Sequence, residues 1–448
     1  MAHMQDYIAR LEDGYRAATP RSRELFERSL VHMPGGAKGA YYYKPYPLAM
    51  ERGEGCHLHD VDGRSYVDFT NHHTSLIVGH RHPAVLAAVD KQMQKGITLG
   101  APVGIESENA AEICSRVPSV EKLRFCNSGT EATLHAIRLA RGLTDRPKIA
   151  KFEGGYHGSH DAVEISVAPP LDKAGPVDAP IAVPQVKGIS PGALEEVVLL
   201  PYGDETAVEK LVVENREELA CVMYDPRAGV MPQKPAFSQF LRRITEENDI
   251  LLIFDEIVGF SAGRSGLHGR LGIKPDLSTY GKIVGGGFPV GAFGGRADIM
   301  ELLDGTKAPS GFFQSGSFSG HPLGMAAGLA TLQQLTTEAF AHLENLSERL
   351  CNGLNGLFEE EAFEAQAVHN GAVFSIHFTK DELINYRSIA AADKTMSYPI
   401  FLSLLEEGYL LSYGMAMNSI SLPTRERDID GLIAAFGRVI RNLKGVSR

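Results

Sequence analysis

The chain has 448 residues, a formal net charge of −11 and 22% charged residues. This length is sufficient for two domains with sizeable cores, and the acidic balance argues against a nucleic-acid surface, because phosphate binding requires clustered Lys and Arg. No apolar run approaches the roughly 20 residues of a membrane span, and the N-terminus lacks a secretion signal. We therefore expect a cytoplasmic enzyme without nucleic-acid or membrane partners.

The five cysteines and sixteen histidines are scattered along the chain. No cysteine pair has the short spacing of a zinc or redox motif, and no histidines form the helical pair of a metalloprotease. We expect free thiols in a reducing compartment and no metal site.

The first 70 residues combine helices and short strands. Residues 5–32 have helical periodicity, which stops at the Pro-Gly-Gly of residues 34–36. A tyrosine-rich segment follows at 41–46, and the segment 55–69 then predicts short strands with a hairpin turn at 62–63.

The middle of the chain, from about residue 83 to 320, alternates helical periodicity with short apolar runs. These runs lie at residues 123–126, 149–152, 220–224 and 250–254. Continuous apolar runs are typical of strands buried on both faces, which indicates a largely parallel sheet covered by helices.

The last third of the chain predicts a long helix after about residue 330, strands near 373–378 and 419–422, and a final helix with one apolar stripe. The whole layout predicts an α/β fold, with a large domain around a mostly parallel sheet and a smaller α+β domain from both chain ends. The expected boundaries are 1–82 for an N-terminal segment of the small domain, 83–325 for the large domain, and 326–448 for the rest of the small domain.

A possible phosphate cradle follows the strand at 123–126. Ser128, Gly129 and Thr130 open the next helix, where free backbone N–H groups, hydroxyls and the positive end of the helix dipole favour an anion. The alternative is an ordinary helix cap, because Ser and Thr are preferred there in any case.

Two further segments supply titratable groups. Asp255 and Glu256 end a buried strand, where open α/β sheets bind ligands and where a carboxylate can pair with a heteroaromatic nitrogen. Lys282 lies between Gly281 and a glycine triplet, and a lysine made less basic by burial becomes a nucleophile for Schiff-base formation. Taken singly, a strand-end turn and a solvated lysine in a glycine loop remain alternatives.

Two weaker elements complete the pattern. Tyr156 and His157 follow another strand end, where an aromatic ring can stack on a flat cofactor, and residues 315–322 form a second hydroxyl-rich turn before a helix. Together the five elements supply two phosphate-binding turns, a partner for a pyridinium nitrogen, a stacking ring and a reactive lysine. This combination is what pyridoxal 5'-phosphate requires.

On these motifs the sequence resembles the class III (omega) aminotransferases of pyridoxal phosphate fold type I, the aspartate-aminotransferase-like fold. This family includes glutamate-1-semialdehyde aminomutase and beta-amino-acid aminotransferases. The resemblance runs from residues 33–36 to the last helix, and its most diagnostic stretches are 128–132, 255–256 and the loop around Lys282.

The resemblance implies a role for each matching residue. The catalytic residues would be Lys282, which forms the Schiff base and shuttles a proton, Asp255 on the pyridine nitrogen, and Tyr156 over the ring face. The cofactor-binding residues would be Ser128, Gly129, Thr130, Tyr156, His157, Asp255, Lys282 and Ser317. Ser317 matches a threonine that reaches the phosphate of the neighbouring subunit, so the resemblance also implies a homodimer with shared active sites.

The sequence departs from the family around the substrate. Tyr413 stands where some relatives carry a carboxylate-binding arginine, and Gly39 and Tyr42 stand at about the positions of the aminomutase's substrate-binding serine and arginine. We expect Tyr42, Tyr413 and Arg264 near the substrate, with Lys38, Lys44 and Arg227 as further candidate cations. Packing in the core or at an interface is the alternative for the tyrosines.

The favoured activity is transfer of an amino group from an amine or amino acid, including beta- or omega-amino donors, to a keto or aldehyde acceptor. An aminomutase of the glutamate-1-semialdehyde type and an ammonia-lyase are the alternatives, because they share the cofactor residues. A nicotinamide dehydrogenase is rejected, since no Gly-x-Gly-x-x-Gly motif follows a first strand with an acidic residue about 20 positions on.

Overall fold

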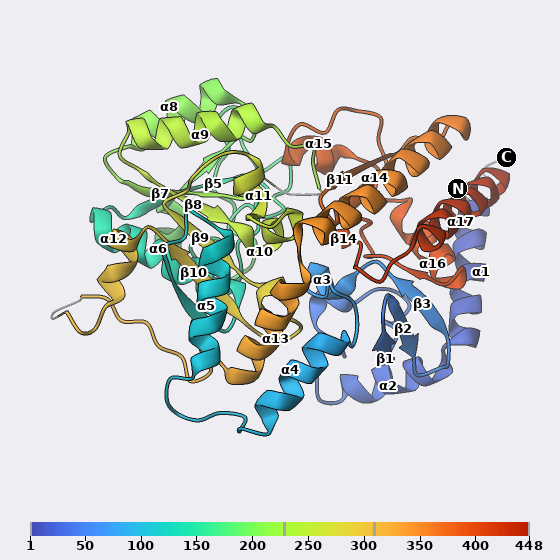
Figure 1. Ribbon diagram of the computed structural model, residues 1–448. Helices are drawn as coiled ribbons and strands as arrows, with labels where there is room; N and C mark the ends of the chain where they lie inside the picture. The colour runs from blue at the N-terminus through green and yellow to red at the C-terminus, as the bar shows by residue number, and fades with distance from the viewer. Residues whose placement is uncertain (1, 227–229, 308–310, 447–448) are drawn as a thin grey trace. The chain divides into compact units, whose positions relative to one another are not determined.

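The computed structural model describes residues 2–226, 230–307 and 311–446 (Figure 1). Contacts divide the chain into two units. The terminal unit comprises residues up to His82, then His342–Lys380, and residues from Ala392 onward; the central unit comprises Pro83–Ala341 and Asp381–Ala391. The central unit extends past the expected boundary at 325 because helix α13 (Pro322–Gln334) packs against helices α4 (Pro83–Met93) and α5 (Gly104–Arg116) of the same unit.

The central unit contains a seven-stranded sheet with strand order β4-β10-β9-β8-β7-β5-β6. The strands are β4 (Lys122–Cys126), β5 (Lys148–Phe152), β6 (Val197–Leu200), β7 (Leu219–Tyr224), β8 (Leu251–Asp255), β9 (Leu277–Tyr280) and β10 (Gly291–Gly295). Neighbouring strands are parallel except at β10, which runs antiparallel to both β4 and β9. The predicted α/β fold with a mostly parallel sheet is confirmed.

Strand β10 escaped sequence analysis because three of its five residues are glycines, which have a low strand propensity. The structure explains them by close approach of the backbone. A Cβ atom on Gly291 would lie 2.1 Å from the Ser128 carbonyl oxygen, and one on Gly295 would lie 2.1 Å from the Asp276 carbonyl oxygen. Gly291 therefore lets β10 approach the turn that contains Ser128, and Gly295 lets it approach the backbone at Asp276.

Helices surround this sheet (Figure 1). They are α4, α5, α6 (Gly129–Thr144), α7 (Pro191–Glu195), α8 (Glu205–Asn215), α9 (Pro235–Glu247), α10 (Glu256–Gly259), α11 (Gly266–Arg270), α12 (Ala297–Met300), α13 and α15 (Tyr386–Ala391). Helix α6 packs across β4, β7, β8, β9 and β10. Every residue of β7 is buried, which accounts for its continuous apolar run.

The terminal unit contains two small sheets. In the first, β1 (Met50–Glu54), β2 (His57–Asp60) and β3 (Ser65–Asp68) are antiparallel, and β13 (Tyr409–Leu410) pairs in parallel with β3. The predicted hairpin is present, and the Asp60 carboxylate accepts the N–H groups of Asp62 and Arg64 in its turn.

The second sheet consists of β11 (Gln366–Asn370), β12 (Val373–His377) and β14 (Asn418–Ser419). The strand predicted at 419–422 is shorter, because Leu422 donates its N–H to Ile77 outside the ladder. The helices of this unit are α1 (Ala2–Ala18), α2 (Pro20–Leu30), α3 (Asn71–Thr74), α14 (Thr337–Glu360), which begins in the central unit, α16 (Ser397–Glu406) and α17 (Glu426–Val446). In α17 the predicted apolar stripe is buried almost throughout.

All five cysteines are free thiols. Within the described residues, no helix combines the length and apolar character needed to cross a membrane. In the same part of the chain, no three His, Cys, Asp or Glu side chains gather in a group that could hold a metal ion.

Candidate active site

The turn between β4 and α6 has the geometry of an anion cradle. Ser128 caps α6 by accepting the Glu131 N–H at 3.1 Å, and Glu131 accepts the Asn127 N–H at 2.9 Å. This reciprocal cap satisfies two backbone N–H groups and fixes the turn, while the first N–H groups of the helix have no partner within it. A Cβ atom on Gly129 would lie 2.5 Å from Ile257 Cδ1, so a larger residue there would have to displace the Ile257 side chain.

Asp255 lies at the carboxyl end of β8 and is held by three hydrogen bonds. Its Oδ1 accepts the Ile257 N–H at 3.1 Å and the Thr279 hydroxyl at 3.0 Å. Its Oδ2 lies 2.8 Å from His157 Nδ1, and the side chain is 4% exposed. A buried carboxylate fixed in this way can hold a cationic partner in one position.

His157 connects this carboxylate to the loop after β5. Its side chain is 1% exposed, and with Nδ1 bonded to Asp255, Nε2 is buried without a hydrogen-bond partner among the described residues. Buried polar atoms are rarely left unpaired, so this nitrogen marks a place where a bound group can supply the missing partner.

Lys282 follows β9 at the start of a 3-10 turn over Lys282–Gly285 and is half-buried. Burial lowers the pKa of its ammonium group, and the carboxylates of Asp255 and Asp225 act in the opposite direction. Its φ of 52° lies in the left-handed region, which costs on the order of 1–3 kcal/mol for a residue with a side chain. The lysine is therefore held in a strained position and loses its proton more readily than a solvated lysine.

The loop after β5 packs against the anion cradle. A Cβ atom on Gly158 would lie 2.8 Å from Thr130 Cα, and Ser159 donates its N–H to the Thr130 hydroxyl at 3.3 Å. Tyr156 is 53% exposed, and its hydroxyl lies 3.3 Å from Ser159 Oγ. The structure thus brings Tyr156, His157 and Thr130 together.

Ser317 lies in a loop beside the same cradle. Gln314 donates to the Phe125 carbonyl at 3.1 Å, and a Cβ atom on Gly316 would lie 3.2 Å from Asn127 Nδ2. Ser317 is exposed, and Phe318 next to it is 62% exposed.

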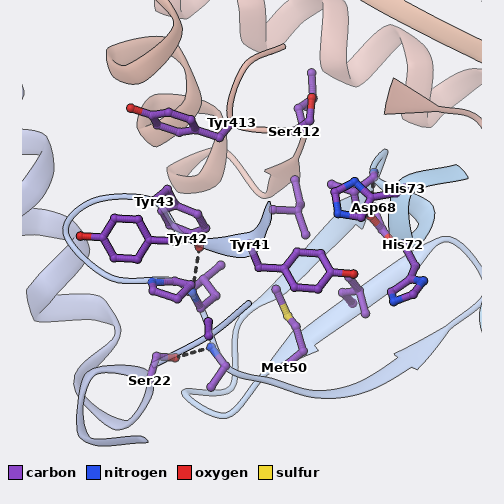
Figure 2. Close-up of a pocket in the computed structure, with 18 of the residues that line it drawn as sticks. Ser22, Tyr41, Tyr42, Tyr43, Met50, Asp68, His72, His73, Ser412 and Tyr413 are labelled. Atoms are coloured by element: carbon purple, nitrogen blue, oxygen red, sulfur yellow. Dashed lines mark hydrogen bonds between the residues drawn. The ribbon is translucent and has the colours of Figure 1, made fainter. Parts of the chain in front are cut away.

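The three expected substrate residues belong to two different units. Tyr42 and Tyr413 line a cavity of about 500 Å³ whose lining residues all belong to the terminal unit (Figure 2). Arg264 belongs to the central unit, where it is exposed and lies near Arg116. Among the further candidate cations, Lys38 lies 4.2 Å from the centre of the Tyr41 ring, Lys44 is exposed, and Arg227 lies outside the described residues.

Sequence analysis missed two groups of residues around these sites. Thr279, which supports Asp255, belongs to β9, and its segment was not expected to form a strand. His72 and His73 line the cavity from a left-handed turn that contains no glycine, the residue that most often signals such a backbone in a sequence.

The fold and the described site define a pyridoxal 5'-phosphate enzyme of fold type I. The chain belongs to the aminotransferase class-III family, whose model matches residues 39–424. Its cofactor is pyridoxal 5'-phosphate, and its activity is that of a class III aminotransferase or aminomutase.

The proteins to which this chain is similar include both aminomutases and transaminases. Glutamate-1-semialdehyde 2,1-aminomutase of Methanocaldococcus jannaschii is 39% identical over 393 residues, which cover 87% of this chain and 90% of the relative. An omega-transaminase from Sphaerobacter thermophilus has a similar structure, with a TM-score of 0.90, 35% identity and coverage of 94% and 98% of the two chains. A beta-phenylalanine aminotransferase from Variovorax paradoxus has a TM-score of 0.88 and 34% identity over 98% of each chain.

Proposed function

We propose that this protein is an aminotransferase that moves an amino group from a small amine or amino-acid donor to a keto or aldehyde acceptor. The observation that carries the proposal is the set of side chains around Lys282, in which a fixed carboxylate, an anion cradle and a lysine with a lowered pKa lie within one unit. Two structures of similar fold and 34–35% identity are named as transaminases.

The residues of the central unit fit pyridoxal 5'-phosphate. The N-terminus of α6, with Ser128, Gly129 and Thr130, would hold the phosphate. Asp255 would hold the pyridine nitrogen, with the carboxylate oriented by His157, whose buried Nε2 has no protein partner among the described residues. Tyr156 would cover the ring face. When bound, the cofactor withdraws electrons from the donor carbon that carries the amino group.

Lys282 has two tasks in this proposal. It would hold the resting cofactor covalently through its side-chain nitrogen, and after the donor has displaced it, the free amine would accept a proton from the donor carbon. Burial favours the neutral amine, which is the form that can accept this proton. Asp255 would hold the ring nitrogen while Lys282 accepts the proton, so the two residues would have separate tasks.

An aminomutase is the second candidate, because curated relatives of 37–39% identity bear that name. Glutamate 1-semialdehyde retains a carboxylate on its side chain, and such a group requires a cationic partner when it is buried. The cavity at Tyr42 and Tyr413 has no Lys or Arg among the described residues that line it. The lining also includes His72, His73 and His80, so its composition does not decide between the two candidates.

The deciding experiment is multiple turnover with and without an added keto or aldehyde acceptor. An aminotransferase requires the acceptor and forms its amine in amounts equal to the donor consumed. Sustained isomerisation of glutamate 1-semialdehyde without an acceptor would establish the mutase, and sustained release of ammonia would establish a lyase.

We also propose a homodimer in which Ser317 completes the partner's phosphate site, supported by the exposed loop that carries Ser317 and Phe318. The five free thiols support a cytoplasmic location.

A further inference from the structure

Glu256 follows Asp255 at the end of β8, but its carboxylate belongs to a separate group of side chains. It is 0% exposed and accepts the Leu267 and His268 N–H groups at 3.1 and 2.8 Å. Gly266 has a φ of 74°, and a Cβ atom there would lie 2.7 Å from Glu256 Oε1. The glycine thus leaves space for a buried carboxylate that the proposed function does not use.

His268 connects this carboxylate to a serine. Its Nδ1 lies 2.6 Å from Glu256 Oε1, and its Nε2 lies 2.8 Å from Ser119 Oγ. Because an ionised carboxylate can only accept, Nδ1 carries the proton, and Nε2 of the neutral ring accepts the Ser119 hydroxyl. The His268 side chain is 3% exposed, so water does not compete for these two hydrogen bonds.

Ser119 lies in a tight turn between α5 and β4. Val120 donates its N–H to the Val117 carbonyl at 2.9 Å and closes this turn. Pro118 and Ser119 are its two central residues, and proline is favoured at the first of them because its ring fixes φ. The serine is therefore held by the backbone of the turn on one side and by His268 on the other.

Ser119 is partly exposed and lines a second cavity, of about 580 Å³, whose lining residues all belong to the central unit. Arg242 and Arg296 line the same cavity, and the Asp276 carboxylate fixes their guanidinium groups at 2.8 and 2.9 Å. A volume of this size accommodates a small organic molecule. The guanidinium groups supply fixed positive charge for an oxygen that becomes negative during a reaction.

We propose that Ser119, His268 and Glu256 form a second catalytic site, which hydrolyses small carboxylic esters without the cofactor. A hydroxyl, an imidazole and a carboxylate joined in this order by two hydrogen bonds are the groups that nucleophilic acyl transfer requires. None of the three side chains is among those assigned to the cofactor. The inference therefore stands or fails separately from the proposed function.

The hydrolysis has two steps. Ser119 Oγ first attacks the ester carbonyl carbon and gives its proton to His268 Nε2; the bond from that carbon to the alkoxy oxygen breaks, and the alcohol leaves with the proton. A water molecule then gives a proton to Nε2 while its oxygen attacks the acyl carbon; the bond to Oγ breaks, Oγ takes the proton back, and the carboxylic acid is released. Glu256 remains an anion throughout and stabilises the imidazolium.

A fluorophosphonate tests the nucleophile without any turnover. This reagent bonds through phosphorus to the oxygen of an activated serine and loses fluoride, so peptide mass mapping of the cofactor-loaded protein shows which serine has reacted. We expect the adduct on Ser119. Ser190 is the internal comparison, because it is exposed and caps α7 by accepting the Ala193 N–H at 3.2 Å. An unmodified Ser119, or equal modification of Ser119 and Ser190, would overturn the proposal.

Two variants test the base and the hydrolysis. His268→Gln retains a donor for Glu256 but no base, and we expect modification of Ser119 to slow by about 10²-fold, since a general base typically contributes 10²–10⁴-fold. Ser119→Ala removes one oxygen atom and should lower sustained hydrolysis of p-nitrophenyl acetate by about the same factor, with the melting temperature and transamination unchanged. Ser190→Ala is the matched control and should hydrolyse the ester normally. Hydrolysis that Ser119→Ala leaves unchanged, or Ser119 modification as fast in His268→Gln as in the wild type, would overturn the proposal.

Discussion

The cofactor region around Lys282 and the cavity around Tyr413 use different means to fix their side chains. Asp255 is 4% exposed and accepts hydrogen bonds from three sides, so few changes there are tolerated. Tyr42 and Tyr413 are 47% and 43% exposed and are positioned mainly by packing of rings. Hydrogen bonds to a buried carboxylate therefore fix the geometry of the cofactor region, whereas contacts between aromatic rings fix that of the cavity.

Backbone strain is common to both regions. Lys282 and the turn at His72 and His73 all have φ between 52° and 54° without being glycine. In each region the side chains of the strained residues face the site. Substitution of these residues should therefore alter function more strongly than it alters the fold. Four substitutions in the cofactor region test how sensitive this region is to single changes.

The largest effect is expected from Lys282→Ala. In the proposed function, loss of the amine removes both the covalent attachment and the proton acceptor, so turnover should fall by about 10⁴-fold. Steady-state kinetics with the best donor measures this fall, and circular dichroism checks the fold. Partial recovery on adding a small primary amine would show that the missing group is the base. A variant that retains more than a tenth of normal turnover would exclude Lys282 from the chemistry.

Asp255→Asn should lower the rate of proton removal by about 10²-fold while cofactor still binds, because a neutral amide no longer favours a protonated ring nitrogen, whose pKa would fall by roughly 1–3 units. Single-turnover absorbance measures this rate.

Asp276→Asn is the matched control for Asp255→Asn. Asp276 is also buried, but its carboxylate pairs with Arg242 and Arg296 and accepts the Leu252 N–H. We expect that variant to lower the melting temperature and leave the rate per folded site unchanged. If the two variants behaved alike, Asp255 would be a structural residue only.

Gly129→Ala should weaken cofactor binding by about tenfold. The added methyl group would lie 2.5 Å from Ile257 Cδ1, and such overpacking typically costs roughly 1–3 kcal/mol. Adding Ile257→Val removes that Cδ1 atom and should restore much of the affinity, which cofactor fluorescence titration can measure. Gly14→Ala has no atom within 4 Å of its new methyl group and serves as the neutral control. An unchanged cofactor dissociation constant for Gly129→Ala would show that the turn at Ser128–Thr130 has room for the added methyl group.

Much of the cofactor region could be predicted because its signals are local. The cap at Ser128 and Glu131, the strand-end carboxylate at Asp255 and the glycines beside Lys282 each lie within a few residues of one another. The cavity could not be predicted in this way. Its walls come from residues 22–80 and 401–417, and its left-handed turn contains no glycine to indicate it. Strand β10 was also missed, because close backbone approach, not β propensity, determines its sequence.

Ser317→Ala is expected to have the smallest effect. In the proposed dimer the Ser317 hydroxyl would reach a partner's phosphate, and its loss should then raise the cofactor dissociation constant by about threefold, since one hydrogen bond contributes roughly 0.5–1.5 kcal/mol. Titration of the variant with cofactor at several protein concentrations measures this dissociation constant, because sites that span two subunits lose cofactor on dilution. A monomer that holds its full cofactor at every concentration would contradict a shared site.

The most direct test of the central claim is to identify the lysine that carries the cofactor. Borohydride treatment of the loaded protein should fix the cofactor on Lys282, and peptide mass mapping should find the adduct there in nearly every chain. Lys151 is the internal comparison, because it is also buried in the central unit but donates its ammonium protons to the Gly155 and Ile165 carbonyls. An adduct on Lys151 or any other lysine, with Lys282 unmodified, would contradict the account.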